Sequence, residues 1–303
     1  MPNWNELLVE VSEIKQPSPY DVVRRKYLGL LQQKTGRNVI IYYSGWLQKQ
    51  GAPGTEINDE DKEGFMTTVN GLDRRLGLDL VLHTPGGGAA ATESLVDYLR
   101  SLFGTDIRAF VPQLAMSGGT MIACACKLIV MGKESSLGPI DPQLNGVPAH
   151  GVIEEFQRAR DEIAKNKDTI PLWQPIIAKY PPTFVGNCQK AVDWSQSLVR
   201  SWLESGMFGD QTLQTGDFDR ILEGLGNHAL TLSHERHLSA ETCRQMGLKI
   251  SKLEEDQELQ DAVLSVHHAC MLTFMATPAV KIIENHKGTA FIKLVTPVVT
   301  ATK

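Results

Sequence analysis

The pattern of apolar and polar residues predicts alternating helices and strands up to residue 131. Apolar positions recur at helical spacing from Tyr20 to Lys34, and Gly36 follows as a helix stop. Apolar runs predict strands at 38–43, 78–83, 106–111 and 128–131, and the first of them, NVIIYY, is β-branched and aromatic with no charge, which suits a buried parallel strand. Helices are expected between them at 59–76, 89–102 and 121–127. Strands that alternate with helices indicate a parallel sheet with helical crossovers.

The pattern becomes mainly helical beyond Gly138. Amphipathic spacing predicts helices at 152–165, 185–203, 210–226, 238–246 and 257–285. The segment 168–182 contains four prolines and is expected to be irregular, whereas 248–253 has the composition of a strand. The last stretch, FIKLVTPVVTATK, also resembles a strand, but the sequence indicates no partner for it.

Length and composition narrow the class of protein. A chain of 303 residues suits one large domain, or a main domain with an appended one. The net charge of -5 argues against a nucleic-acid-binding surface, which needs clustered Lys and Arg. No apolar run is long enough to predict a membrane span, and the N-terminal sequence does not resemble a signal peptide.

The cysteines agree with a reducing compartment. Their number is odd and their spacing does not match a zinc site, so free buried thiols are expected at Cys124, Cys126, Cys188, Cys243 and Cys270. We therefore expect a cytoplasmic protein.

Two glycine-rich turns, each at the carboxyl end of a predicted strand, are the candidates for chemistry. The turn at 84–88 (TPGGG) can present backbone N–H groups to an anion, and the turn at 116–120 (MSGGT) exposes Ser117 at a strand-to-helix junction. Open parallel sheets bind ligands at this edge. No GxxxxGK[ST] motif is present, so a serine nucleophile beside an oxyanion hole is favoured over a phosphate loop. The alternatives without a catalytic role are a glycine turn that only shapes the backbone and a serine that only caps the following helix.

Two segments carry a specific family resemblance. LDLVLHTPGGGAAATESLVDYLRSLF and VPQLAMSGGTMIACACKLIVMGKESSLGPIDPQ closely resemble the serine dehydrogenase proteinase family, a soluble relative of signal peptide peptidase A. The resemblance runs from Arg37 to about Gly151, with a weaker likeness around Gly247. It implies a Clp protease/crotonase-like α/β fold, a right-handed spiral of ββα units, here with a mainly helical C-terminal part.

The resemblance also implies site residues. Ser117 would be the nucleophile, Gly86 and Gly87 would supply oxyanion-hole N–H groups, and Gly118 would be a second donor. Relatives of this fold use either a lysine downstream of the serine or a His with an Asp as the general base. Three candidates remain open here: Lys165, Lys167 and His150, the last with Asp141 to orient it.

Other histidines do not suggest a metal site. His83 is expected to pack at the end of its strand, and His234, His237, His267 and His268 lack metal-ligand spacing with a carboxylate or cysteine. Neither a metal nor a cofactor is expected. The GPIDP segment, 138–142, is expected to form a rigid turn that lines the site.

The favoured function is therefore a serine peptidase acting on peptides or proteins. Two alternatives remain: a non-catalytic assembly protein of the same fold, and a crotonase-like enzyme of acyl thioesters, against which Ser117 argues. Because relatives of this fold close their sites at subunit interfaces, a homo-oligomer is expected, formed partly by the helices after Gly151. The predicted division is an N-terminal helical segment (1–36), a peptidase domain (37–255) and a C-terminal helical tail (256–303).

Overall fold

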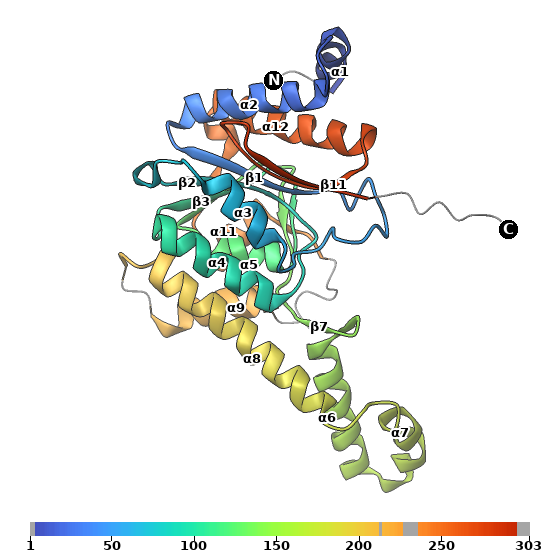
Figure 1. Ribbon diagram of the computed structural model, residues 1–303. Helices are drawn as coiled ribbons and strands as arrows, with labels where there is room; N and C mark the ends of the chain where they lie inside the picture. The colour runs from blue at the N-terminus through green and yellow to red at the C-terminus, as the bar shows by residue number, and fades with distance from the viewer. Residues whose placement is uncertain (1–3, 212–213, 227–235, 296–303) are drawn as a thin grey trace, which may run out of the picture.

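A seven-stranded sheet forms the centre of the protein in a computed structural model that describes residues 4–211, 214–226 and 236–295 (Figure 1). Its strand order is β10-β5-β3-β2-β1-β11-β12, and two smaller sheets pair β4 with β6 and β9, and β7 with β8. The strands are β1 (Asn38–Ser44), β2 (Leu78–His83), β3 (Ile107–Val111), β4 (Leu114–Ala115), β5 (Leu128–Met131), β6 (Ser136–Leu137), β7 (Gln143–Leu144), β8 (Val147–Pro148), β9 (Leu238–Ser239), β10 (Ile250–Lys252), β11 (Ala279–Asn285) and β12 (Ala290–Leu294). The run from β10 to β1 is parallel, and β11 and β12 join it antiparallel.

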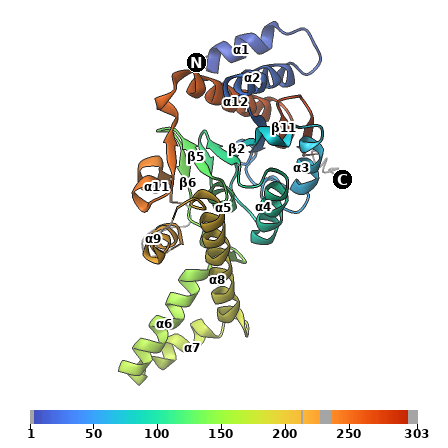
Figure 2. The ribbon, with the colours of Figure 1, turned by 90° about the vertical axis from the view of Figure 1, so that its left-hand side faces the viewer.

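Helices cover both faces of this sheet, as Figures 1 and 2 show from two sides. They are α1 (Trp4–Glu13), α2 (Pro19–Thr35), α3 (Asp61–Val69), α4 (Ala89–Phe103), α5 (Gly118–Cys124), α6 (Ala149–Lys165), α7 (Ile170–Ile177), α8 (Phe184–Trp202), α9 (Thr215–Gly226), α11 (Ala240–Met246) and α12 (Gln257–Ala276). Helices α1, α2 and α12 pack on one face, and α3, α4, α5, α8, α9 and α11 pack on the other. In the described part of the chain, no helix has the length and apolar character needed to span a membrane.

Burial on both faces explains why the strand β1 contains no charged residue. Along β1, Val39, Ile41 and Tyr43 belong to the cluster under α2 and α12, whereas Ile40 and Tyr42 belong to the opposite cluster. Successive side chains of a strand point to opposite faces, so apolar residues at successive positions suit a strand that is covered on both sides. All five cysteines are buried and free, as predicted.

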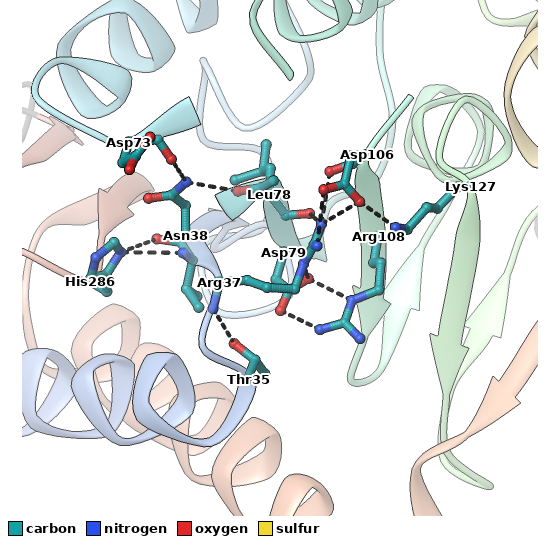
Figure 3. Close-up of polar contacts among 12 residues, drawn as sticks. Thr35, Arg37, Asn38, Asp73, Leu78, Asp79, Asp106, Arg108, Lys127 and His286 are labelled. Atoms are coloured by element: carbon teal, nitrogen blue, oxygen red, sulfur yellow. Dashed lines mark hydrogen bonds and ion pairs between the residues drawn. The ribbon is translucent and has the colours of Figure 1, made fainter. Parts of the chain in front are cut away.

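The amino ends of the parallel strands are held by ion pairs (Figure 3). Asp79 is fully buried and accepts hydrogen bonds from Arg37 at 2.9 Å and from Arg108 at 2.7 Å. Asp106 pairs with Arg37 at 3.0 Å and also with Lys127. These ion pairs lie at the amino end of the parallel strands, and the glycine turns lie at the carboxyl end.

A helical arm, residues 149–192, projects from the body (Figures 1 and 2). It consists of α6, α7 and the first part of α8, and it has its own small core of Ala149, Val152, Phe184, Cys188 and Val192. Three apolar side chains of α7 remain exposed: Ile170, Leu172 and Ile176. The arm therefore offers an apolar surface at a distance from the main core.

Several predicted elements need correction. The helix expected at 59–76 ends at Val69, because Gly71 adopts a φ of +72° and residues 74–76 form only a 3₁₀ turn. The helix expected at 257–285 ends at Ala276, because Pro278 favours an extended Thr277, and β11 follows. The segment expected to be irregular contains α7, with Pro171 in its first turn. The first part of the C-terminal stretch has a partner, since β12 pairs with β11, and residues 296–303 lie outside the described ranges.

Candidate active site

A cavity of about 500 Å³ opens at the carboxyl end of β2. Its walls are formed by Glu56, the glycine turn after β2, Ser117 with the first part of α5, the β7–β8 hairpin with the GPIDP segment, and one side of α8. The lining residues are Glu56, Pro85, Gly86, Gly87, Gly88, Ala89, Ser117, Met121, Ile140, Pro142, Gln143, Leu144, Gly146, Ala191, Trp194 and Ser195. Ser117 and the glycine turn therefore share one cavity.

Backbone pairing brings the two glycine turns together. The N–H of Thr84 donates to the carbonyl of Leu114 at 3.1 Å, and the N–H of Met116 donates to the carbonyl of Thr84 at 3.0 Å. This bridge fixes the turn after β2 beside the strand that leads into Ser117. The contact is so close that a Cβ atom on Gly86 would lie 2.6 Å from the Cβ of Ser117. Only glycine fits at position 86.

Ser117 has an unusual backbone conformation, with φ of +50° and ψ of -113°. Non-glycine residues rarely adopt positive φ, and such strain concentrates at functional sites. The residue lies at the N-cap position of α5, yet its side chain makes no capping hydrogen bond. Among the residues that the structure describes, nothing is hydrogen-bonded to its hydroxyl. The simple N-cap alternative therefore does not account for Ser117.

The backbone N–H groups around Ser117 differ in their availability. The N–H of Gly86 donates to Thr84 Oγ1 at 3.2 Å, and the N–H of Gly88 donates to the carbonyl of Ile57 at 3.0 Å. Within the described ranges, no acceptor is assigned to the N–H of Gly87 or of Gly118. A Cβ atom on Gly118 would lie 3.4 Å from the nitrogen of Gly87, so the two glycines are in contact.

The GPIDP segment is anchored to the helix that follows Ser117. The N–H of Gly138 donates to Thr120 Oγ1 at 2.9 Å, and the hydroxyl of Thr120 lies 2.8 Å from the carbonyl oxygen of Ala115. This anchor brings Ile140 and Pro142 to the cavity wall, as the sequence predicts. Leu137, directly before this segment, is buried in the core, whereas Leu144 and Trp194 line the cavity.

The three candidates for the base do not reach this cavity within one chain. His150 lies near the start of α6 and faces a separate hollow with Arg200, Asp219 and Glu223. Lys165 ends α6 and Lys167 follows it, both exposed. A helix of 17 residues is about 25 Å long, so these lysines lie at the far end of the arm. No histidine or lysine is among the described residues that line the cavity.

Two other residues considered from sequence are buried. His83 lies between the rings of Trp46 and His267, at centroid distances of 4.3 and 5.2 Å, and burial lowers its pKa well below the usual value. Its ring nitrogens have no hydrogen-bond partner among the described residues, although one satisfied bond is expected from sequence. Asp141 is buried, and its Oδ1 lies 3.4 Å from the backbone nitrogen of His150.

No cluster suited to a metal ion is found in the ranges that the structure describes. His234 lies outside those ranges.

Some site residues give no signal in the sequence. Ile57 pairs with the glycine turn on both sides of Gly87, and Trp194 and Ser195 reach the cavity from α8. These contacts join residues far apart in the chain, so local patterns do not reveal them.

The comparisons with known proteins place these features in a family. A protein-family model described as a ClpP-like SDH-type serine proteinase matches residues 16–180, more than half of the chain. The chain is similar to two uncharacterised proteins of Methanocaldococcus jannaschii. MJ0137 is 28% identical over 64% of this chain and 60% of its own length, and MJ1495 is 33% identical over 36% and 37%. The chain therefore spans less than two thirds of either relative.

One solved structure is similar at lower identity. It is a mutant of the 1510-N membrane-bound stomatin-specific protease, with 16% identity, coverage of 68% of this chain and 79% of that one, and a TM-score of 0.38.

Proposed function

The chain belongs to the ClpP-like SDH-type serine proteinases, and from this premise we propose that it cleaves peptide bonds through an acyl-enzyme at Ser117. The Oγ atom of Ser117 attacks the substrate carbonyl carbon, and a base takes the hydroxyl proton and returns it to the leaving amine as the C–N bond breaks. Water then hydrolyses the ester. The observation that carries this proposal is the strained Ser117 in the shared cavity, with its hydroxyl engaged by no described residue.

We assign the oxyanion hole to the N–H groups of Gly87 and Gly118. These two lie next to each other beside Ser117 and have no acceptor within the described residues. Gly86, expected from sequence to be a donor, has its N–H bonded to Thr84. Its role is instead to let the turn pass in contact with Ser117. Donors already fixed in place stabilise developing charge without reorganisation, and one such donor contributes about 3 to 4 kcal/mol.

The lining of the cavity suits an extended peptide with apolar side chains. Met121, Ile140, Leu144, Ala191 and Trp194 supply apolar surface around the reacting centre. Gln143 and the backbone of the glycine turn supply polar groups that fix a peptide main chain. This mixture is typical of ligand cavities, in which apolar walls give affinity and a few polar groups give orientation.

We propose that the protein forms a homo-oligomer and that the base reaches the cavity from a second copy. Lys165 and Lys167 lie at the far end of the arm, beside the exposed apolar side chains of α7, so an interface through this surface would carry them toward a neighbouring body. His150 remains the alternative base. Support for this arrangement comes from the cavity of one chain, whose described lining has no histidine or lysine.

The test of the nucleophile is covalent labelling with a fluorophosphonate probe, read by intact mass and peptide mapping. We expect one adduct, on Ser117, in the wild type and none in Ser117→Ala. Ser195→Ala is the matched control, because Ser195 lines the same cavity but its hydroxyl donates to Val192 within α8. No labelling in any assembled state would favour the non-catalytic alternative.

Mixing inactive variants tests the source of the base. Ser117→Ala subunits keep both lysines, and Lys165→Ala/Lys167→Ala subunits keep the nucleophile. If the base comes from a neighbour, each variant alone is inactive and mixed oligomers recover labelling. A base within the same chain gives no recovery on mixing. His150→Ala, mixed in the same way, tests the third candidate.

A further inference from the structure

A fully buried ion pair lies behind the glycine turn. Lys281 of β11 and Asp61 at the start of α3 are 0% and 2% exposed, and Lys281 Nζ lies 2.6 Å from Oδ1 and 2.9 Å from Oδ2 of Asp61. Burial lowers the pKa of Lys281, and the Asp61 carboxylate opposes this shift. Removing two charges from water is costly, and a well-packed apolar pair is often as stable. Stability alone therefore does not explain the pair.

The two charged groups hold the chain on either side of Ile57. Lys281 Nζ donates to the carbonyl of Glu56 at 2.7 Å, and the N–H of Asn58 donates to Asp61 Oδ2 at 3.0 Å. The hydroxyl of Tyr42 donates to the same carboxylate oxygen at 2.6 Å. Residues 56–58 are thus fixed at both ends by one ion pair.

Ile57 in turn fixes the glycine turn on both sides of Gly87. Its N–H donates to the carbonyl of Gly86 at 2.7 Å, and its carbonyl accepts from the N–H of Gly88 at 3.0 Å. In a trans peptide the C=O and the following N–H point in opposite directions. Because the Gly86 carbonyl points at Ile57, the N–H of Gly87 must point away from the Ile57 backbone.

We propose that the Lys281–Asp61 pair is a positioning element of the oxyanion hole, which aims the N–H of Gly87 through residues 56–58. The proposal rests on the function proposed above, and neither residue touches the substrate. It explains why a buried lysine and carboxylate are placed where they can bond to Glu56 and Asn58. The close approach of residues 56–58 also requires glycine at position 87, where φ is +157° and a Cβ atom would lie 2.3 Å from the carbonyl oxygen of Ile57.

The test uses a variant that removes both charges with little change in volume, Lys281→Met/Asp61→Asn. The matched control is Arg24→Met/Glu284→Gln, because Arg24 of α2 and Glu284 of β11 form an equally buried pair. The hydrogen bonds of that pair to other residues go to Asp21, Arg25 and Thr273, away from the glycine turn. Both variants are expected to lower the melting temperature. Only the first is expected to slow fluorophosphonate labelling of Ser117, by at least about tenfold. The upper limit is the factor of about 10² to 10³ that follows the complete loss of one oxyanion-hole donor.

Kinetics and hydrogen exchange separate positioning from folding. In peptide hydrolysis the first variant should have a lower kcat with little change in KM, because the N–H of Gly87 stabilises the transition state rather than the bound substrate. Amide exchange in peptides covering 55–58 and 84–90 should accelerate in the first variant and stay slow in the control. Lys281→Arg, which keeps the positive charge, should retain most of the wild-type labelling rate. Equal labelling rates and equal exchange in both variants would overturn the proposal.

The exchange experiment also distinguishes the two proposals. If the wild type cannot be labelled but exchange accelerates only in Lys281→Met/Asp61→Asn, the pair still holds the turn and the proposed catalysis is wrong. If the wild type is labelled and neither readout responds to the pair, the positioning proposal fails and the catalysis stands.

Discussion

Gly86 and Ser117 are in direct contact across the site, so close that a single methyl group on Gly86 would lie 2.6 Å from the Cβ of the serine. Gly86 also has a φ of +94°, which a side chain disfavours. We expect Gly86→Ala to displace Ser117, to abolish its labelling and to destabilise the protein by about 1 to 3 kcal/mol. Intact-mass labelling and thermal unfolding measure the two effects.

Gly88→Ala is the control for that substitution. Gly88 has a φ of -60°, and a Cβ atom there would meet its nearest neighbour at 3.8 Å. Labelling at the wild-type rate is expected. Equal losses in both variants would mean that any side chain in the turn is harmful, and the specific contact with Ser117 would not be the cause.

Thr120→Val should loosen the wall of the cavity. The substitution keeps the shape of the side chain but leaves the buried N–H of Gly138 without its acceptor, which costs about 1 to 3 kcal/mol. Urea unfolding should show this loss, and KM for peptides should rise because Ile140 and Pro142 lose their anchor. Thr120→Ser retains the hydroxyl and should behave like the wild type. A stable Thr120→Val with unchanged KM would contradict the role given to Thr120.

Acid should destabilise the protein through its buried histidines. Burial lowers the pKa of His83 well below its usual value and that of His267 to about 3. As the pH falls below about 6.5, the unfolded chain binds protons that the folded protein excludes. The free energy of unfolding then falls by about 1.4 kcal/mol per pH unit for each histidine. For His267 this loss ends near pH 3, where the folded protein also binds the proton.

His83→Phe tests this linkage. It retains the ring between Trp46 and His267 and removes two nitrogens without described partners, so the dependence of stability on pH should become less steep below pH 6.5. Denaturant unfolding at several pH values measures the slope. His237→Gln, at an exposed position, should leave the slope unchanged.

Asp79→Asn should destabilise the sheet at the end remote from the cavity. Asp79 is fully buried between Arg37 and Arg108, so losing its charge leaves two partly buried guanidinium groups poorly compensated (Figure 3). A cost of about 3 to 5 kcal/mol is expected for breaking a buried pair. Asp106→Asn, at a partly exposed carboxylate, should cost less. Labelling of Ser117 in the folded fraction should be unaffected, and a selective loss of labelling would show that the two ends of the sheet are coupled.

Leu172→Glu should disrupt the proposed assembly. Leu172 is 69% exposed on α7, and a charge there would be buried in an interface formed by the arm. Sedimentation velocity should show smaller species and labelling should fall with them. Met275→Glu, 60% exposed on the body, is the control. A wild type that is monomeric at micromolar concentration would remove the basis for this prediction.

The elements between residues 78 and 131 were predictable because each has a local signal. The strand at 78–83, the glycine turn and the following helix agree with the sequence to within one residue, and the predicted Clp protease/crotonase-like class is confirmed. The strand β11 was missed because the helical pattern was extended to Asn285 past Pro278, although a proline there is a sequence signal for the end of the helix. Its partner β1 lies more than 230 positions earlier, where no local pattern links the two.

The site was predictable only in part. Glycines and a serine directly after strands identify the two turns, because an oxyanion hole and a serine nucleophile need these residue types at those positions. Ile57, Asp61 and Lys281 carry no such mark, because an aspartate near a helix start and a lysine in a strand are ordinary features. Their relationship exists only after residues 220 positions apart have met. The division at residues 36 and 255 remains a prediction.

The position of β11 has a consequence for the order in which the protein is made. β1 needs β11 on one side and β2 on the other, yet β11 leaves the ribosome after the five parallel strands and the helical arm. Until β11 has been synthesised, one edge of β1 is unpaired, and Lys281, whose amine holds residues 56–58, is absent. In the scheme proposed here, a nascent chain would carry its serine and glycine turns for most of its synthesis without a finished oxyanion hole. The enzyme would acquire its hydrolytic capacity only when the sheet closes.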